Sequence, residues 1–89
     1  MELKVLEQKK QRFVFELAGA DHTLCNAIKT ELLLDGDVKL ATYAIKHPLI
    51  PMPKFIIETK GKDAMKALLD ASSRLQKEYK GFAAVFEKL

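Results

Sequence analysis

Two kinds of hydrophobic spacing alternate along the chain. In "ELKVLE", Leu3 and Val5 fall on one face of an extended segment. In "RFVFELA", Phe13, Phe15 and Leu17 do the same. A period of two is typical of a strand with one buried side. The polar stretch "QKKQ" between the segments is turn-like, so the two segments are predicted to form a β-hairpin.

The spacing then changes from strand to helix. Leu24, Ile28 and Leu32 recur four residues apart in "LCNAIKTELLL" and form an apolar stripe. Asp21 stands just before this stretch and is a candidate N-cap, whose carboxylate also favours the positive end of the helix dipole. The sequence "DGD" at residues 35–37 is predicted to end the helix.

Two more strands and a second helix complete the pattern. "VKLATYAIK" and "KFIIETK" read as strands, and the prolines of "HPLIPMP" between them cannot lie within a paired strand. "GKD" is a turn, in which Asp63 can cap the helix that follows. The order β-β-α-β-β-α predicts an α+β fold with a mostly antiparallel four-stranded sheet and both helices on one face.

The last predicted helix, residues 63–87, carries a long apolar seam that continues to Leu89. Its positions follow steps of three and four, and only Ser72 is polar: Met65, Leu68, Ser72, Leu75, Tyr79, Phe82, Phe86 and Leu89. At ~1.5 Å per residue the helix would span ~37 Å. A compact chain of this length is only ~30 Å across.

The distal part of this seam is therefore expected to project beyond the sheet. An exposed apolar patch of that size usually marks a partner surface, which predicts an obligate oligomer built largely from helix packing. The alternative is that the helix bends back or frays, and that its aromatic residues cover the chain's own core.

Composition indicates one soluble domain. The 89 residues support a single core, so residues 1–89 are expected to form one domain. The only cysteine, Cys25, cannot form an intramolecular disulfide, which fits a reducing compartment. The N-terminal segment lacks the apolar core of a signal peptide, and no apolar run approaches the ~20 residues of a membrane span. A cytoplasmic protein that does not enter a membrane is expected.

The formal net charge of +3 raises the question of nucleic acid. Lys9, Lys10 and Arg12 form the only dense basic group, and Glu7 and Glu16 flank it. A nucleic-acid surface usually concentrates its charge on one side or interleaves it with aromatic residues. A solvated lysine-rich surface is favoured, and a small α+β nucleic-acid-binding protein is kept as an alternative function.

The stretch "DHTLCN" contains the side chains of a cysteine enzyme or of half a metal site. His22 precedes Cys25 by three residues, and a helix N-terminus lowers a thiol pKa. No second element is clearly suited to orient the histidine, however. With His47 the chain offers three scattered ligands and no second paired motif, so the metal signal is weak. A small cysteine enzyme is a further alternative, and no cofactor is predicted.

Several segments together resemble a known family. "DHTLCNAIKTELL", "VKLATYAIKHPL" and "PKFIIETK", followed by a long helix, are similar to the small assembly subunit of multisubunit RNA polymerases. The family includes subunit L of archaea, the eleventh subunit of eukaryotic RNA polymerase II and, more distantly, the N-terminal domain of the bacterial alpha subunit. The motifs "DHTL-x-N" and "Y-x-x-x-HPL" carry the resemblance, which covers essentially the whole chain.

The resemblance implies an RNA polymerase alpha-type dimerisation domain. Such a protein is a non-catalytic subunit of DNA-directed RNA polymerase, a nucleotidyltransferase complex that acts in transcription. It forms a heterodimer with the larger alpha-like subunit, which is called D in archaea. The heterodimer is the assembly platform for the catalytic subunits and the small zinc-bearing subunits. The family implies no catalytic residue, cofactor or metal in this chain, and contact with DNA only through the assembled polymerase.

The resemblance also directs the choice of interface residues. The family commonly has glycine where this chain has Cys25, and cysteine is small and readily buried, so the substitution affects the helix crossing and not the family. His22, Thr23 and Asn26 are assigned to holding the start of the first helix. The predicted interface residues, from both helices, are Leu24, Ile28, Leu32, Leu68, Leu75, Tyr79, Phe82 and Phe86.

Overall fold

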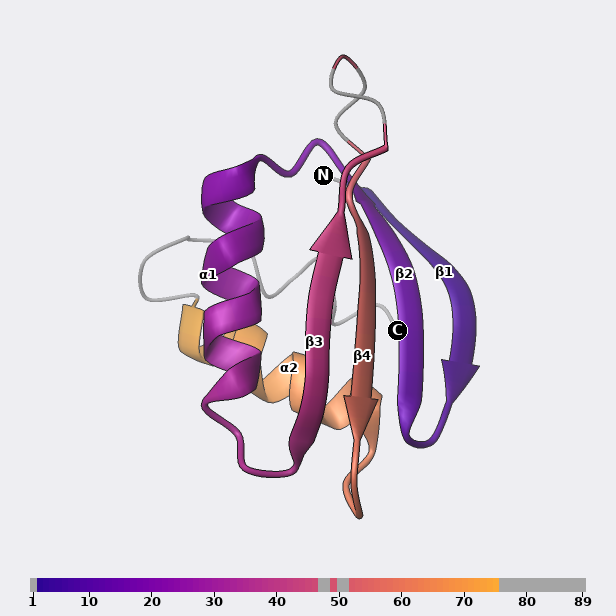
Figure 1. Cartoon of the computed structure of the whole chain (residues 1–89), viewed down its shortest axis with the longest axis vertical. Helices are drawn as coiled ribbons and strands as arrows, with labels where there is room; N and C mark the ends of the chain where they lie inside the picture. Colours follow the sequence, from indigo (N-terminus) through magenta and orange to yellow (C-terminus); the bar gives the residue numbers. More distant parts are fainter. Residues whose placement is uncertain (1, 47–48, 50–51, 76–89) are drawn as a thin grey trace.

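The computed structural model describes residues 2–46, 49 and 52–75. Within these residues, four strands and two helices follow one another in the predicted order (Figure 1). They are β1 (Glu2–Lys9), β2 (Arg12–Ala18), α1 (His22–Leu33), β3 (Val38–Ala44), β4 (Lys54–Thr59) and α2 (Ala64–Leu75). The predicted α+β class and the order of elements are confirmed.

The strands form one sheet in the order β1-β2-β4-β3. Every pair of neighbours is antiparallel, so the predicted four-stranded sheet is antiparallel throughout. β1 and β2 form the predicted hairpin, closed by the pair Lys9 and Arg12. β4 lies between β2 and β3, which puts the hairpin and the second pair of strands into a single sheet.

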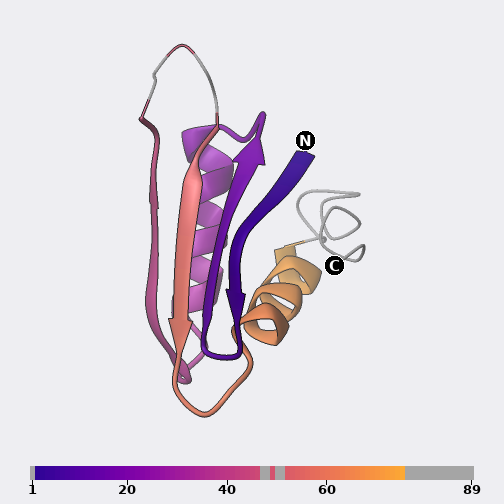
Figure 2. The same cartoon turned by 90° about the vertical axis from the view of Figure 1, so that its right-hand side faces the viewer.

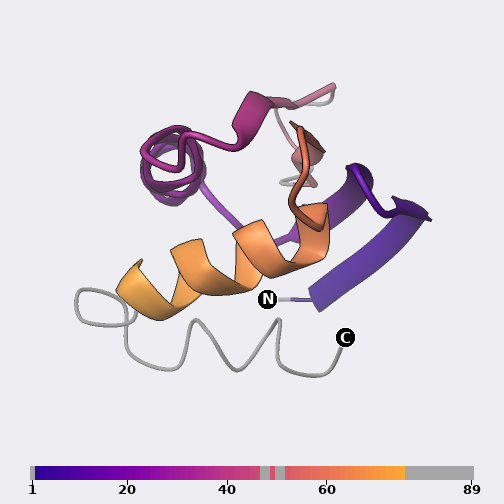
Figure 3. The ribbon, with the colours of Figure 1, turned by 90° about the horizontal axis from the view of Figure 1, so that it is seen from below.

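Both helices cover the same face of this sheet, as predicted (Figures 2 and 3). α1 packs against β3. α2 crosses the same face of the sheet at β2 and β4 and also contacts α1. The core fills the space between the sheet and the two helices. Its largest fully buried side chains include Phe13, Phe15 and Phe55 from the strands and Ile28 and Leu68 from the helices.

The strand periodicity holds best in the central strand β2. Phe13, Phe15 and Leu17 are fully buried on the helix-covered face. On the edge strand β1, Leu3 is only partly buried and Val5 is 39% exposed. An edge strand has a neighbour on one side only, and the register of β1 also shifts between Val5 and Glu7, so its inward side chains receive less cover.

The ends of the elements agree with local chemistry. Asp21 is the N-cap of α1, as predicted, and accepts a hydrogen bond from the Leu24 amide at 2.8 Å. β3 ends at Ala44, two residues before the predicted end, because its partner Lys54 follows Pro53, which has no N–H to donate. The Asp63 carboxylate accepts from the Met65 amide at 2.9 Å at the start of α2. The predicted continuation of this helix to residue 87 lies outside the described residues.

Candidate subunit interface

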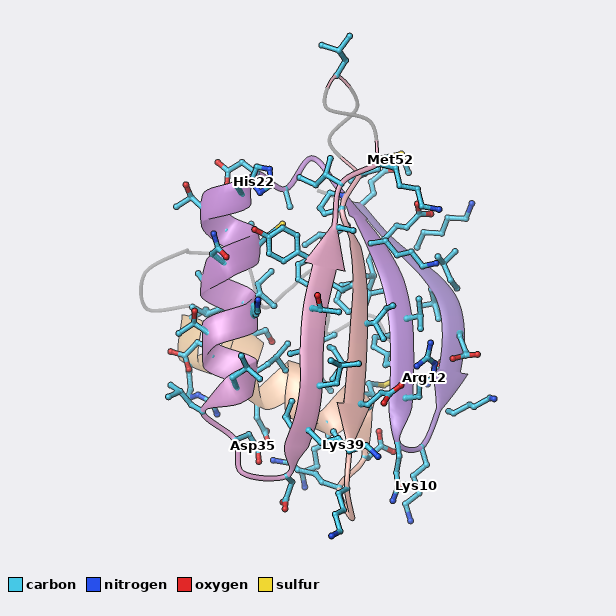
Figure 4. All side chains as sticks on the ribbon, viewed as in Figure 1. Lys10, Arg12, His22, Asp35, Lys39 and Met52 are labelled. Carbon is cyan, nitrogen blue, oxygen red and sulfur yellow. The ribbon has the colours of Figure 1, made fainter. Side chains whose placement is uncertain are left out.

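Two polar side chains of "DHTLCN", Asp21 and His22, hold the start of α1. Besides the Asp21 cap, His22 Nδ1 lies 3.1 Å from the Tyr43 hydroxyl on β3. The two rings are also in contact, with centroids 5.8 Å apart. Figure 4 shows His22 at the N-terminal end of α1. Thr23 and Asn26 are exposed. The histidine therefore joins the helix to the sheet, and its partner is Tyr43, the tyrosine of "Y-x-x-x-HPL", to which the sequence alone assigned no role.

Cys25 belongs to the core. Its side chain is fully buried, and burial, together with the nearby negative charge of Asp21, raises the pKa of the thiol to about 11. A cysteine nucleophile needs the opposite shift, toward a stable thiolate. In the described part of the chain no group of three or more His, Cys, Asp or Glu side chains could hold a metal ion. His47, the third candidate ligand, lies outside the described residues.

Two members of the dense basic group, Lys9 and Arg12, pair with neighbouring carboxylates. Arg12 Nε lies 2.6 Å from a Glu7 carboxylate oxygen, and the same guanidinium also pairs with Glu58. Lys9 Nζ is 4.0 Å from Glu7. These contacts lie on the sheet face that the helices leave open (Figure 4), and they reduce its value as a surface for nucleic acid. None of the helices among the described residues is long and apolar enough to cross a membrane.

Five of the predicted interface residues are described, and all five lie in the chain's own core. On α1 these are Leu24, Ile28 and Leu32, and on α2 they are Leu68 and Leu75. Each is at most 8% exposed. Tyr79, Phe82 and Phe86 lie outside the described residues. The contact of these eight side chains with a second subunit stays a prediction.

Two exposed leucines on α1 were not among the predicted interface residues. Leu33 is 50% exposed and Leu34, the C-cap residue, is 71% exposed. Successive residues of a helix are turned by about 100°, so of the three leucines in "ELLLD" only Leu32 can face the core. The run of three consecutive leucines could have indicated this exposure from the sequence, because a single buried stripe uses only one of them.

Ser72, the polar position in the apolar seam, is buried but has a hydrogen-bond partner. Its hydroxyl donates to the Leu69 carbonyl at 2.8 Å, within the same helix. This local bond allows a serine to lie among apolar residues without leaving a polar atom unpaired. The seam is therefore continuous with the core from Leu68 to Leu75.

Ion pairs connect α1 with α2 and with the turn before it. Lys62 Nζ lies 2.6 Å from an Asp35 oxygen and 3.0 Å from an Asp70 oxygen. Arg74 Nε lies 2.8 Å from a Glu31 oxygen. The hydrogen bonds with Asp35 and Asp70 raise the pKa of Lys62, and the bond with Lys62 lowers the pKa of Asp35. Sequence reasoning did not find these pairs, because their members are far apart along the chain.

Comparison with known proteins shows what this architecture is similar to. Residues 12–84 match the family model described as the RNA polymerase Rpb3/Rpb11 dimerisation domain. DNA-directed RNA polymerase subunit Rpo11 of Methanothrix thermoacetophila is 40% identical over 75 residues, which cover 84% of this chain and 82% of that protein. Subunit Rpo11 of Methanococcoides burtonii is 39% identical over 88 residues, covering 99% and 97%.

A solved structure agrees with the sequence matches. The crystal structure of DNA-directed RNA polymerase subunit L from Thermoplasma acidophilum superposes with a TM-score of 0.76 at 31% sequence identity, covering 98% of this chain and 86% of that one. The family resemblance predicted from "DHTL-x-N" and "Y-x-x-x-HPL" is confirmed by these matches. The chain belongs to the RNA polymerase Rpb3/Rpb11 dimerisation domain family.

Proposed function

We propose that the chain is a non-catalytic subunit of DNA-directed RNA polymerase. It pairs with the larger alpha-like subunit, which is called D in archaea, and the pair forms the platform on which the catalytic subunits assemble. The observation that carries this proposal is the match over 99% of the chain and 97% of a protein named as a polymerase subunit. The match of residues 12–84 to a dimerisation domain supports the pairing.

The chemistry of the described residues supports a role without catalysis. The histidine and cysteine that could have formed an active site are used in the fold, His22 against Tyr43 and Cys25 in the core. We infer that the subunit acts in a nucleotidyltransferase complex through protein contacts, without a cofactor of its own. The single cysteine fits a reducing compartment, so a cytoplasmic location goes with this role.

We propose that the partner contacts the layer formed by the two helices. This surface includes the exposed leucines Leu33 and Leu34 at the end of α1. We expect the predicted seam of the final helix, which includes Tyr79, Phe82 and Phe86, to extend it. The buried stripe of Leu24, Ile28 and Leu32 packs α1 onto the chain's own core. Burying large apolar side chains supplies about 1.5–3 kcal/mol each, so this surface would supply much of the favourable free energy that offsets the cost of association.

Substitution of Leu34, the more exposed of the two leucines, tests this surface with little risk to the fold. Leu34→Asp should weaken pairing with the alpha-like subunit, because a carboxylate would have to be desolvated at the interface. Leu49→Asp is the matched control, since Leu49 is 95% exposed and lies in the loop between β3 and β4. Pairing is measured by co-purification of the two co-expressed subunits. Equal recovery with Leu34→Asp and Leu49→Asp would remove Leu34 from the interface.

The predicted distal seam is tested in the same assay. Phe82→Asp should abolish co-purification while leaving secondary structure in the circular dichroism spectrum. Lys77→Asp, which falls off the seam, should leave the complex intact. If the unaltered chain fails to recover the alpha-like and catalytic subunits from a native lysate, the proposed function is wrong. Binding of the isolated chain to DNA with a steep dependence on salt would favour the nucleic-acid alternative.

A further inference from the structure

The α1–α2 junction contains two separate ionic contacts. At one, Arg74 of α2 lies 2.8 Å from the Glu31 carboxylate and also donates to the Glu31 carbonyl at 3.0 Å. At the other, Lys62 of the β4–α2 turn bridges Asp35 at 2.6 Å and Asp70 at 3.0 Å. Asp35 lies two residues after the end of α1, at the end of the helix opposite to His22 (Figure 4). Both contacts therefore connect the C-terminal end of α1 with α2, the second of them through Lys62.

The spacing of these contacts allows them to fix the direction of α2 relative to α1. Asp70 and Arg74 are four residues apart on α2, which corresponds to about one turn, or ~6 Å along the axis. Their partners Glu31 and, through Lys62, Asp35 lie in the last turn of α1 and two residues beyond its end. One contact allows a helix to pivot about it, whereas two contacts a turn apart along α2 resist rotation. Together they define the angle at which α2 crosses α1.

The apolar packing of α2 determines this angle only in part. Leu68 and Leu75 are buried, but three of the other buried residues are alanines, Ala64, Ala67 and Ala71. Helix crossing angles are set by ridges of side chains that fit into grooves of the neighbouring helix. Alanine ridges are low, so the part of a helix that packs through them resists turning less than a part with large side chains. The charged groups supply the directional part of the junction.

Each of these ion pairs is at least partly exposed. The side chains of Arg74 and Asp70 are 45% and 43% exposed, and those of Lys62 and Asp35 are 24% and 14% exposed. Exposed pairs add little to the free energy of folding, and salt weakens them further. Their effect on geometry is therefore expected to exceed their effect on the stability of the fold.

We propose that Lys62 and Arg74 are positioning residues for subunit pairing. They hold α2 at the angle to α1 that the alpha-like partner requires, so that the helical surface is arranged before the partner binds. This inference rests on the proposed function. When a binding-competent arrangement is only partly populated, the apparent dissociation constant rises in inverse proportion to its population. A chain that adopts the correct angle one tenth of the time would thus bind about tenfold more weakly.

The test uses the purified full-length chain and the purified larger alpha-like subunit. Kd is measured by calorimetric titration for the unaltered chain and for Arg74→Gln and Lys62→Gln, and each variant is also unfolded in urea. Arg12→Gln is the matched control, because it breaks a similar network with Glu7 and Glu58 on the other face of the sheet. The expected result is about a tenfold rise in Kd for the two junction variants. Arg74→Gln and Arg12→Gln should have urea midpoints close to that of the unaltered chain, Lys62→Gln should be only slightly less stable, and the control should have an unchanged Kd.

A charge exchange separates positioning from direct contact with the partner. The double variant Glu31→Arg with Arg74→Glu restores the pair in reverse and should recover most of the affinity lost in Arg74→Gln. The conservative Lys62→Arg should likewise keep most of the affinity. Failure of the exchange to recover affinity would mean that Arg74 contacts the partner itself, which overturns the inference.

Two further outcomes are distinguishable. An unchanged Kd in both Arg74→Gln and Lys62→Gln, with a normal Kd for the unaltered chain, overturns the positioning role and leaves the proposed function intact. Absence of binding by the unaltered chain overturns the proposed function, and the inference with it.

Discussion

The ring of Phe15 on β2 stacks on the ring of Phe55 on β4. The centroids are 5.0 Å apart and the planes differ by 5°. The two residues are direct register partners in the central pair of strands, and each is at most 1% exposed. Phe13 and Tyr43 extend the aromatic contact at centroid distances of 5.2 and 5.4 Å. This group joins β2, β4 and β3 beneath the helices.

The aromatic stack predicts a large loss of stability on truncation. Phe55→Ala should lower the free energy of unfolding by about 3–5 kcal/mol, because it removes buried surface and leaves a cavity in the core. The measurement is urea unfolding followed by circular dichroism. Thr42→Ala, on the open face of β3, should cost less than about 1 kcal/mol. Comparable losses for the two variants would contradict the central role of the stack.

The N-cap of α1 predicts a smaller and more specific effect. Asp21→Ala should lower the free energy of unfolding by about 0.5–2 kcal/mol, since the Leu24 amide loses its acceptor. Asp21→Asn should retain most of this stability, because asparagine also caps well. Asp37→Ala, in the exposed loop after α1, is the control for loss of a carboxylate. If Asp21→Asn were as unstable as Asp21→Ala, the cap would not be the cause.

Cys25 should be slow to react and should make stability depend on alkaline pH. Its pKa is raised from the ordinary 9.0 to about 11, so the thiol stays protonated at neutral pH and reacts with iodoacetamide more slowly than a free cysteine. The folded state also holds this proton more tightly than the unfolded chain does. The resulting stabilisation is present below pH 9 and is lost as the pH rises to about 11.

Two variants isolate this titration. Cys25→Ser does not titrate in this range, so the loss of stability between pH 9 and 11 should be smaller than in the unaltered chain. In Asp21→Asn the pKa of Cys25 should fall, because a neighbouring negative charge is removed, while burial keeps it above 9.0. The readouts are alkylation rate against pH and urea unfolding at each pH. Rapid alkylation at neutral pH would contradict the buried position of the thiol.

The Asp35–Lys62 pair should make the stability of the fold depend on pH in the acid range. The hydrogen bond with Lys62 lowers the pKa of Asp35, followed by the bond that Asp35 accepts from the Asp37 amide. A carboxylate with a lowered pKa stabilises the fold above its unfolded pKa of about 3.9, and this contribution is lost as the pH falls through the folded value. Asp35→Asn should flatten the fall in stability below pH 4, and so should Lys62→Gln. A slope as steep as that of the unaltered chain in both variants would contradict the pairing.

Much of the fold follows from local patterns in the chain. The alternation around Phe13, Phe15 and Leu17 predicted a strand with one buried side, and the four-residue spacing from Leu24 to Leu32 predicted a helix. Asp21 was identified as its cap from position alone. These predictions succeeded because strand and helix periods and capping depend on residues close together in the chain.

The interface residues were harder to predict. An apolar stripe such as Leu24, Ile28 and Leu32 shows that one side of a helix is covered, but not by which chain. The structure covers these residues with the protein's own sheet and second helix. The exposure of Leu33 and Leu34 could have been predicted by comparing the number of leucines with the single buried stripe that α1 needs.

The sequence by itself determined the elements, their order, their caps and, through its motifs, the family. Only the tertiary structure decided that β4 lies between β2 and β3, and that Glu31 meets Arg74 and Asp35 meets Lys62. The physical reason is distance along the chain. Periodicity and capping act within a few residues, whereas a sheet order or an ion pair across 43 positions depends on how the whole core packs.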